Sequence, residues 1–488
     1  MSPRVRKSVW QDDQGAILIL WAVIMTVILG LIALAFDFGQ KASTQSELQS
    51  FADQVALAAA GELDGKSDAI TRATNAANNL IIDQQTFATG TRALSGSSDF
   101  TLTFFDRLPS SDTASAAAGA TTTPASAIFV QARVTPRTVP FTFTGAFDVF
   151  AGTQTANPQI GAVAVAGFTQ FACDITPLMF CIPSATFRAN DNVGKMILLR
   201  AGGNGAAWGP GDFGFLDPAG LKVDPAGPCA GRSGAQLTVC LIGASGALTQ
   251  CFSQRGVNTE PGQKVGIENS AFNVRFDMFG TMLNSQRNNP IYAPAPNVIK
   301  GRVPRTGGGG NACIGNNSDP SPNTVGLPRD GCFAAGTCSR FGDGNWAAGR
   351  ANYVNINYGP GVADPHAAAT TRYQYYLREI LAAGGGGSRT RILPAGRAET
   401  GRPQCSNQQS NDPDRRVVVA AGIDCSANPI SGNTSNVPVQ EFVKLFMTEP
   451  VGNSNTFDMF VEVVGSAESG SGSGGTGGII HDVVQLYR

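Results

Sequence analysis

The chain has 488 residues and a formal net charge of −1, and only 15% of its residues are charged. Because the charge is balanced and no basic cluster contains interleaved aromatic residues, the sequence indicates no nucleic-acid partner. Low charge together with 59 glycines favours an extracytoplasmic protein that is rich in β-structure and long loops.

Residues 16–36, AILILWAVIMTVILGLIALAF, form an apolar run without a single charge. At about 1.5 Å per residue, a helix of this length spans roughly 30 Å, the thickness of the hydrocarbon layer of a bilayer. Signal peptides have a shorter apolar core that is followed by a small-residue cleavage site. Neither feature occurs here, so the run predicts an uncleaved transmembrane helix, with a buried core helix as the alternative.

The charges that flank this run predict its orientation. Arg4, Arg6 and Lys7 precede it, and Lys41 is the only nearby base after it. Because basic residues are retained in the cytoplasm, we expect a cytoplasmic leader of residues 1–15 and translocation of the rest of the chain.

Cysteines occur only on the translocated side: Cys173, Cys181, Cys229, Cys240, Cys251, Cys313, Cys332, Cys338, Cys405 and Cys425. An even number in an oxidising compartment indicates disulfides. Short separations favour Cys173 with Cys181, and Cys332 with Cys338. Free thiols or partial pairing remain open. Metal binding is the weakest alternative, because C-x-x-C does not occur and both histidines lie far from any cysteine pair.

Helical periodicity continues beyond the apolar run. Leu48, Phe51, Val55 and Ala59 recur at helical spacing, so we expect the helix to extend outward to about residue 62. This stripe either packs onto the next domain or forms a partner-binding surface for another subunit. A second, Ala-rich helix is expected over about residues 67–82.

Strand patterns cluster towards the two ends of the remaining chain. The first group is 100–105, 129–134, 139–143 and 161–166, and the second is 416–421, 439–446, 456–464 and 479–486. We expect both groups to share one sheet in a single extracytoplasmic α+β domain, residues 63–488. The Gly-rich and Cys-rich middle, about 200–415, is then a loop-rich insertion stapled by disulfides.

The residues around the apolar run resemble the N-terminal segment of the TadG-like family of Tad/Flp pilus assembly proteins. Gln14, Gly15 and Ala16 open the span, Asp37 and Gly39 follow it, and LQSFADQVALAAA at 48–60 forms the helical signature. The resemblance implies a pilin-like extended helix in residues 16–62. It also implies a single-pass component of pilus assembly in the bacterial inner membrane, with its bulk in the periplasm. Its partners would be the lipid bilayer and other Tad/Flp pilus assembly proteins.

Two motifs of related proteins are missing. Type IV-like pilins carry a glutamate at the fifth residue after the processing site, and Leu20 stands there if Gly15 precedes that site. We therefore expect residues 1–15 to be retained, with a minor pilin-like subunit as an alternative. The D-x-S-x-S motif of von Willebrand A-type metal sites is also absent. Its nearest form, Asp99-x-Thr101-x-Thr103, lies in a predicted strand.

No sequence motif indicates catalysis. G-x-S-x-G and H-E-x-x-H do not occur, and we expect His366 and His481 to be structural. Asp343, Asn345 and the run 411–414 favour polar turns over weak calcium sites. We expect no enzyme activity, cofactor, metal or small-molecule substrate. A membrane-tethered extracytoplasmic hydrolase that uses acids in the 200–440 region is the competing hypothesis, because paired carboxylates need no local spacing.

Overall fold

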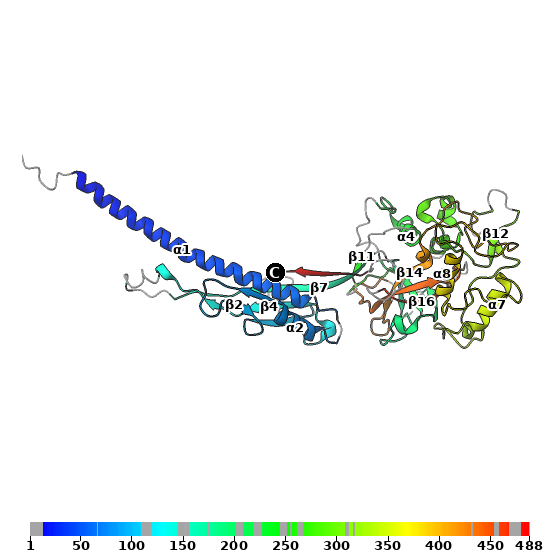
Figure 1. Ribbon diagram of the computed structural model, residues 1–488, viewed down its shortest axis with the longest axis horizontal. Helices are drawn as coiled ribbons and strands as arrows, with labels where there is room; N and C mark the ends of the chain where they lie inside the picture. The colour runs from blue at the N-terminus through cyan, green and yellow to red at the C-terminus, as the bar shows by residue number, and fades with distance from the viewer. Residues whose placement is uncertain are drawn as a thin grey trace, which may run out of the picture. The chain divides into compact units, whose positions relative to one another are not determined.

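The computed structural model describes the chain in a series of segments. These are residues 13–65, 67–108, 119–144, 152, 156–173, 175–201, 208–217, 227–244, 251–253, 256–260, 267–307, 312–315, 318–430, 433–452, 458–467 and 480–487. The chain forms two compact units, which Figure 1 traces by colour along the chain. The first unit comprises Met1–Thr169 and Asp482–Arg488, and the second comprises Gln170–His481. This division differs from the expected single domain of residues 63–488.

One long helix, α1 (Asp13–Ala60, 48 residues), dominates the first unit. It confirms that the helix continues beyond the apolar run, to Ala60. Gly61 follows the last helical residue, and Gly65 takes a φ of 80°, which favours glycine and turns the chain. The chain then enters α2 (Ala69–Leu80), whose buried alanines, including Ala73 and Ala77, allow it to pack closely on α1.

The first unit contains a larger sheet, in which the strand pairs within residues 100–167 are antiparallel. Its strands are β3 (Phe100–Phe105), β4 (Phe129–Val134), β7 (Val163–Cys173) and β17 (Ile480–Leu486), in which β4 lies between β3 and β7, and β17 pairs with β7. Alternate side chains of β4 are fully buried: Val130, Ala132 and Val134. They share one core with the C-terminal half of α1, which we call its outer half. Two small ribbons complete the unit: β1 (Ile82–Gln84) with β2 (Ala93–Ser95), and β5 (Arg137–Thr138) with β6 (Gln159–Ile160).

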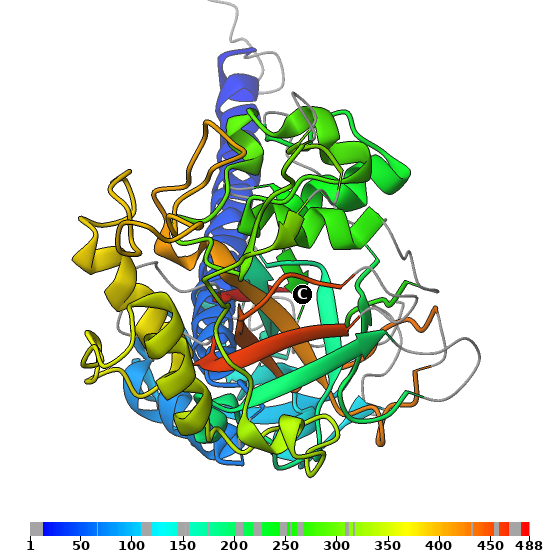
Figure 2. The same ribbon diagram turned by 90° about the vertical axis from the view of Figure 1, so that its right-hand side faces the viewer.

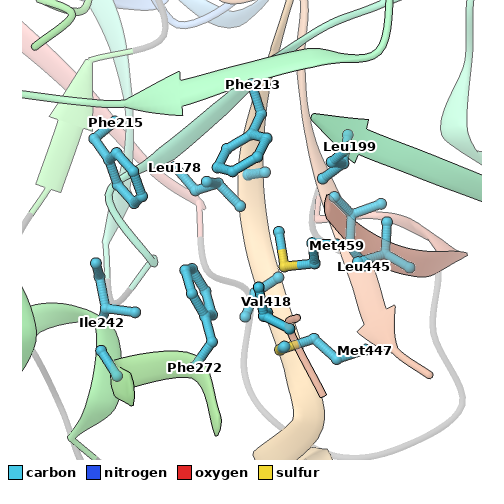
Figure 3. Close-up of a cluster of buried hydrophobic side chains, with 14 of the residues drawn as sticks. Leu178, Leu199, Phe213, Phe215, Ile242, Phe272, Val418, Leu445, Met447 and Met459 are labelled. Atoms are coloured by element: carbon cyan, nitrogen blue, oxygen red, sulfur yellow. The ribbon is translucent and has the colours of Figure 1, made fainter. Parts of the chain in front are cut away.

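The second unit is built on a closed six-stranded barrel in the order β10-β8-β14-β15-β16-β9 (Figure 2). The strands are β8 (Leu178–Cys181), β9 (Met196–Ala201), β10 (Asp212–Phe215), β14 (Val417–Ile423), β15 (Glu441–Met447) and β16 (Asp458–Ser466). Its largest core contains alternate residues of these strands, such as Leu445 and Met447. Phe272 of α5 (Ile267–Asn273) and Ile242 of α4 (Gly234–Gly243) pack against them (Figure 3). The barrel is therefore filled by side chains.

Other elements of the second unit surround the barrel. The helices are α6 (Gly331–Ala334), α7 (Ala347–Asn357) and α8 (Arg372–Ala382), and the strand pairs include β12 (Arg302–Pro304) with β13 (Ser318–Pro320). Residues 171–173 of β7 pair with β11 (Cys251–Ser253). Short 3₁₀ helices occur at Pro124–Ser126 in the first unit and, in the second, at Ala189–Asn192, Val274–Phe276, Thr281–Gln286, Pro290–Tyr292 and Pro413–Arg416.

We expected the strands at 100–166 and those at 416–486 to share one sheet, and only one strand of the second group does so. β17 joins β7, but β14, β15 and β16 close the barrel with β8, β9 and β10. The reason is that residues 178–215 supply three further strands, which offer β14 and β16 partners within the second unit. The strand expected at 139–143 is also wrong, because residues 142–144 form a helical turn.

The described residues of the second unit include the disulfides Cys181–Cys425, Cys229–Cys240, Cys313–Cys405 and Cys332–Cys338. The expected pair Cys332–Cys338 is confirmed, with its Cα atoms 5.2 Å apart. The expected pair Cys173–Cys181 is wrong, because Cys181 lies opposite Ile423 on β14 and bonds to Cys425, two residues beyond. In the antiparallel pairing of β7 with β11, the backbone of Cys173 lies opposite that of Cys251.

Candidate membrane-anchor site

The N-terminal half of α1, which we call its inner half, exposes an almost unbroken apolar surface. The large side chains from Leu18 to Phe36 are 39–76% exposed, and the helix is long and apolar enough to cross a membrane. Removing one such side chain from water contributes about 1.5–3 kcal/mol, so leaving this whole surface in water would cost tens of kcal/mol. The single hydroxyl of the run, on Thr26, donates to the Ala22 carbonyl at 2.8 Å, which satisfies it within the helix. This half of α1 is suited to a hydrocarbon environment.

Asp37 directly follows the apolar run, and its carboxylate is buried, with 1% of the residue exposed. Its oxygens accept hydrogen bonds from the backbone N–H groups of Thr142, Phe143 and Thr144 at 2.6–3.3 Å. They also accept one from the Thr144 hydroxyl at 2.7 Å. These N–H groups open a helical turn, where backbone donors lack partners of their own, so the carboxylate and the turn satisfy each other.

These hydrogen bonds keep Asp37 charged. Burial raises the pKa of the carboxyl, but the donors from Thr144, Phe143 and Thr142 outweigh it and hold the pKa below its ordinary value. Sequence analysis identified Asp37 as the exit residue of the span. It gave no sign of the partners, which lie about a hundred residues further along the chain.

The outer half of α1 has the opposite environment. Leu48, Phe51, Val55 and Ala59 are all 0% exposed and pack in the core that α1 forms with α2 and the sheet. This stripe therefore packs within the protein, which was one of the two expected alternatives. Its side chains are not exposed as a partner-binding surface. A helical stripe looks the same in sequence whether a neighbouring domain or another subunit covers it.

Polar side chains fix the same half of α1 to the rest of the first unit. Gln49 donates to the Val163 carbonyl of β7 at 3.2 Å. Glu47 accepts from the backbone and hydroxyl of Thr86 at 2.9 and 2.7 Å, and Gln54 donates to Asp83 at 3.2 Å. Together with the Asp37 contacts, these bonds hold the unit to the helix over more than a dozen residues.

One group of potential metal ligands occurs in the described part of the chain, formed by Asp330, Cys332 and Asp343. It does not fit a metal, because Cys332 is bonded to Cys338 and its sulfur is not a thiolate. Asp330 is already used: it pairs with Arg372 at 2.5 Å and accepts from the backbone of Gly344 at 2.9 Å. Asp343 accepts from the backbone of Asn345 at 3.0 Å, which is the polar turn that the sequence favoured.

One buried acid, Glu379 of α8, lies in an aromatic cluster of the second unit. It accepts hydrogen bonds from the hydroxyls of Tyr353 and Tyr358 at 2.8 and 2.9 Å and from the Asn297 amide at 2.7 Å. Burial raises its pKa to about 7, against the opposing effect of these donors. Because the residue is only 1% exposed, it has no open face towards a substrate.

Another buried acid, Glu462, pairs with Arg372 at 3.0 Å. Arg372 also binds Asp330, and all three side chains are 0% exposed. The sequence did not single out Arg372, because burial of a lone arginine has no local signature. This ion cluster links α8 to β16 and is structural in its contacts.

The two histidines lie in different surroundings. His366 is half-buried against the rings of Tyr358 and Tyr375, with ring centroids 6.1 and 5.0 Å away, and burial lowers its pKa. These contacts agree with the expected structural role. His481 lies on β17, and its side chain is outside the described residues. At 411–414, the Asp412 side chain accepts from the backbone of Asp414 at 2.8 Å, again a polar turn.

Comparison with known families singles out the same helix. The Tad family model, which describes TadE/G-like Flp pilus-assembly proteins, matches residues 15–62. The match spans α1 from its third residue and the turn that follows it, and so confirms the resemblance seen in the sequence for about a tenth of the chain. No curated protein and no solved structure matches this chain.

Proposed function

We propose that this protein is a membrane-anchored assembly component of a Tad/Flp-type pilus, which acts by protein–protein contact in the bacterial envelope. One observation carries the proposal. The segment that matches the pilus-assembly family is a single helix whose inner half is exposed and apolar and whose outer half is built into a folded unit. Such a helix anchors a domain rather than catalysing a reaction.

The proposed topology places residues 1–15 in the cytoplasm and both units in the periplasm. Basic residues precede the span, and the disulfides of the second unit suit an oxidising compartment. In this proposal the leader is retained, because Leu20 stands where pilin processing needs a glutamate. Intact mass of the membrane-extracted protein tests this point: loss of fifteen residues would revive the pilin-like alternative.

Deletion of the gene tests the function. We expect loss of surface pili and of adherence, and rescue by the full chain. Rescue should fail with Val27→Arg/Leu31→Arg, which places two charges on exposed faces of the span. The matched control is Val362→Arg/Leu381→Arg, at exposed apolar side chains of the second unit, which should still rescue. Normal piliation in the deletion strain would overturn the proposal.

A further inference from the structure

The Asp37 contacts fix the position of a second segment along the membrane helix. Among the described residues, the donors to this carboxylate come from residues 142–144. Because Asp37 is the first residue after the apolar run, residues 142–144 lie at the level where the helix leaves the hydrocarbon layer. This placement rests on the proposed membrane anchoring of α1.

The side chain between the two threonines of this turn is apolar and exposed. Phe143 is 44% exposed, and its ring meets that of Phe36 edge to face at 5.5 Å. Phe36, the last residue of the apolar run, is 49% exposed, and Phe38 is 54% exposed. Since successive helical residues differ by about 100°, Phe36 and Phe38 point to different sides of α1. Phe36, Phe38 and Phe143 thus form a phenylalanine collar around the exit of the span.

Lipid is the occupant that this collar fits. It continues the exposed apolar surface of α1 without a break, from the last residue of the run to the turn beside it. Exposed polar residues then begin with Lys41, about 6 Å further along the helix. An apolar ring next to a polar edge is typical of segments that lie at the boundary between headgroups and acyl chains.

We propose that the turn at residues 142–144 is a second membrane contact, in which Phe143 inserts into the boundary between headgroups and acyl chains beside α1. Asp37 acts as the latch that holds the turn there. The carboxylate stays charged without facing lipid, because the turn supplies the hydrogen bonds that water would otherwise provide. The first unit is therefore seated on the bilayer surface rather than tethered above it.

Depth-dependent quenching in the full chain tests this. Phe143→Cys is labelled with an environment-sensitive fluorophore in nanodiscs of phosphatidylethanolamine and phosphatidylglycerol. The fluorophore should react with the introduced cysteine alone, because the described native cysteines include no free thiol. Val27→Cys is the reference within the span. Leu80→Cys is the reference in water, because Leu80 is 72% exposed. It lies close in sequence to Asp83, which accepts a hydrogen bond from Gln54 of α1. Gln54 is about 25 Å further along the helix than Asp37.

We expect lipids with a spin label near the headgroup to quench the label at 143 most strongly, and lipids labelled deep in the acyl chain to quench the label at 27. The label at 80 should keep its emission. If the label at 143 is quenched no more than that at 80 while the label at 27 is quenched, the second contact is wrong and the anchor stands. If the label at 27 also escapes quenching, the anchor itself is wrong.

Asp37→Asn in the Phe143→Cys background tests the latch. It removes the charge that the turn binds, so quenching at 143 by the shallow lipid should fall while quenching at 27 stays unchanged. The matched control is Asp53→Asn, further out on α1, where the carboxylate accepts from Gln49. Unchanged quenching at 143 in Asp37→Asn would overturn the role of the latch.

Discussion

The first unit contains no cysteine, whereas all ten cysteines lie within the second unit. The first unit instead packs a sheet and a short helix against the outer half of α1, with Phe51, Val55 and Ala59 at the contact. The second unit has a filled barrel, and disulfides between its described residues join distant and nearby segments of its chain. A unit built on one long helix has a scaffold whose backbone hydrogen bonds are local, whereas a barrel with long connections gains stability from cross-links that limit its unfolded state.

Removing the longest-range disulfide gives the largest expected effect. Cys181→Ala/Cys425→Ala opens a loop with a sequence separation of 244. It should lower the free energy of unfolding of the second unit by about 5 kcal/mol in the chain-entropy model. Cys332→Ala/Cys338→Ala, with a separation of 6, should cost about 2 kcal/mol. Urea unfolding, followed by hydrogen exchange in each unit, measures both. If the first unit lost as much unfolding free energy as the second, the disulfides would not act on the second unit alone.

Truncating a buried side chain of α1 should destabilise the first unit. Phe51→Ala removes a fully buried ring that packs edge to face on Phe100 at 6.0 Å. We expect a loss of about 3–5 kcal/mol for the first unit, because a cavity remains where the ring lay. Hydrogen exchange of β3 and β4 amides reports the loss, while β14 and β15 should stay protected. Lys41→Ala, at an exposed position of the same helix, is the control and should leave β3 and β4 unchanged.

A pH dependence is expected in the second unit because of Glu379. Its pKa is about 7 in the folded protein and close to 4.5 in the unfolded chain. The folded state therefore binds the extra proton between these values, and stability falls as the pH rises from 4.5 to 7, by on the order of 3 kcal/mol. Glu379→Gln should remove this part of the slope.

The measurement is the difference in urea midpoint between wild type and Glu379→Gln at several pH values, since other buried acids titrate in both proteins. The pH dependence of the first unit should be the same in the two proteins. A difference that does not change between pH 4.5 and 7 would show that Glu379 keeps an ordinary pKa in the folded state.

The smallest effect is expected for Gln49→Ala, which removes one hydrogen bond from α1 to the Val163 carbonyl of β7. The first unit should lose about 1 kcal/mol, the usual value of one neutral hydrogen bond. Gln408→Ala, in a loop of the second unit where the side chain donates to the neighbouring Asn407 at 3.0 Å, is the matched control. Thermal unfolding with exchange of the Val163 segment as the probe would detect the change. No loss at all would mean that packing alone holds the helix to the sheet.

The sequence predicted the parts of this fold that have a local signature. The apolar run and the stripe that includes Phe51 give α1 in nearly its observed length. Alternation of larger apolar with polar or small residues predicts β3 (FTLTFF) and β4 (FVQARV). The pattern arises because one face of each strand is more buried than the other. These patterns depend on the environment of a single element and on nothing distant in the chain.

The barrel and the Asp37 contacts lacked such a signature. β8 is only four residues long and is buried on both faces, so LMFC shows no alternation. Its partners, β10 and β14, lie about 30 and 240 residues further along the chain. Asp37 was identified as an exit residue, but a carboxylate does not indicate which backbone amides will bind it. Pairings of this kind are determined by tertiary packing.

The position of β17 determines when the first unit can be completed during synthesis. Residues 1–169 leave the ribosome first, but the last strand of their sheet is made only after the 312 residues of the second unit, 170–481. At about 5–20 residues per second, the edge of β7 that binds β17 waits for on the order of half a minute. An unpaired strand edge is open to other chains during this time. Residues 482–487 therefore complete a unit whose other part, up to residue 169, is made much earlier.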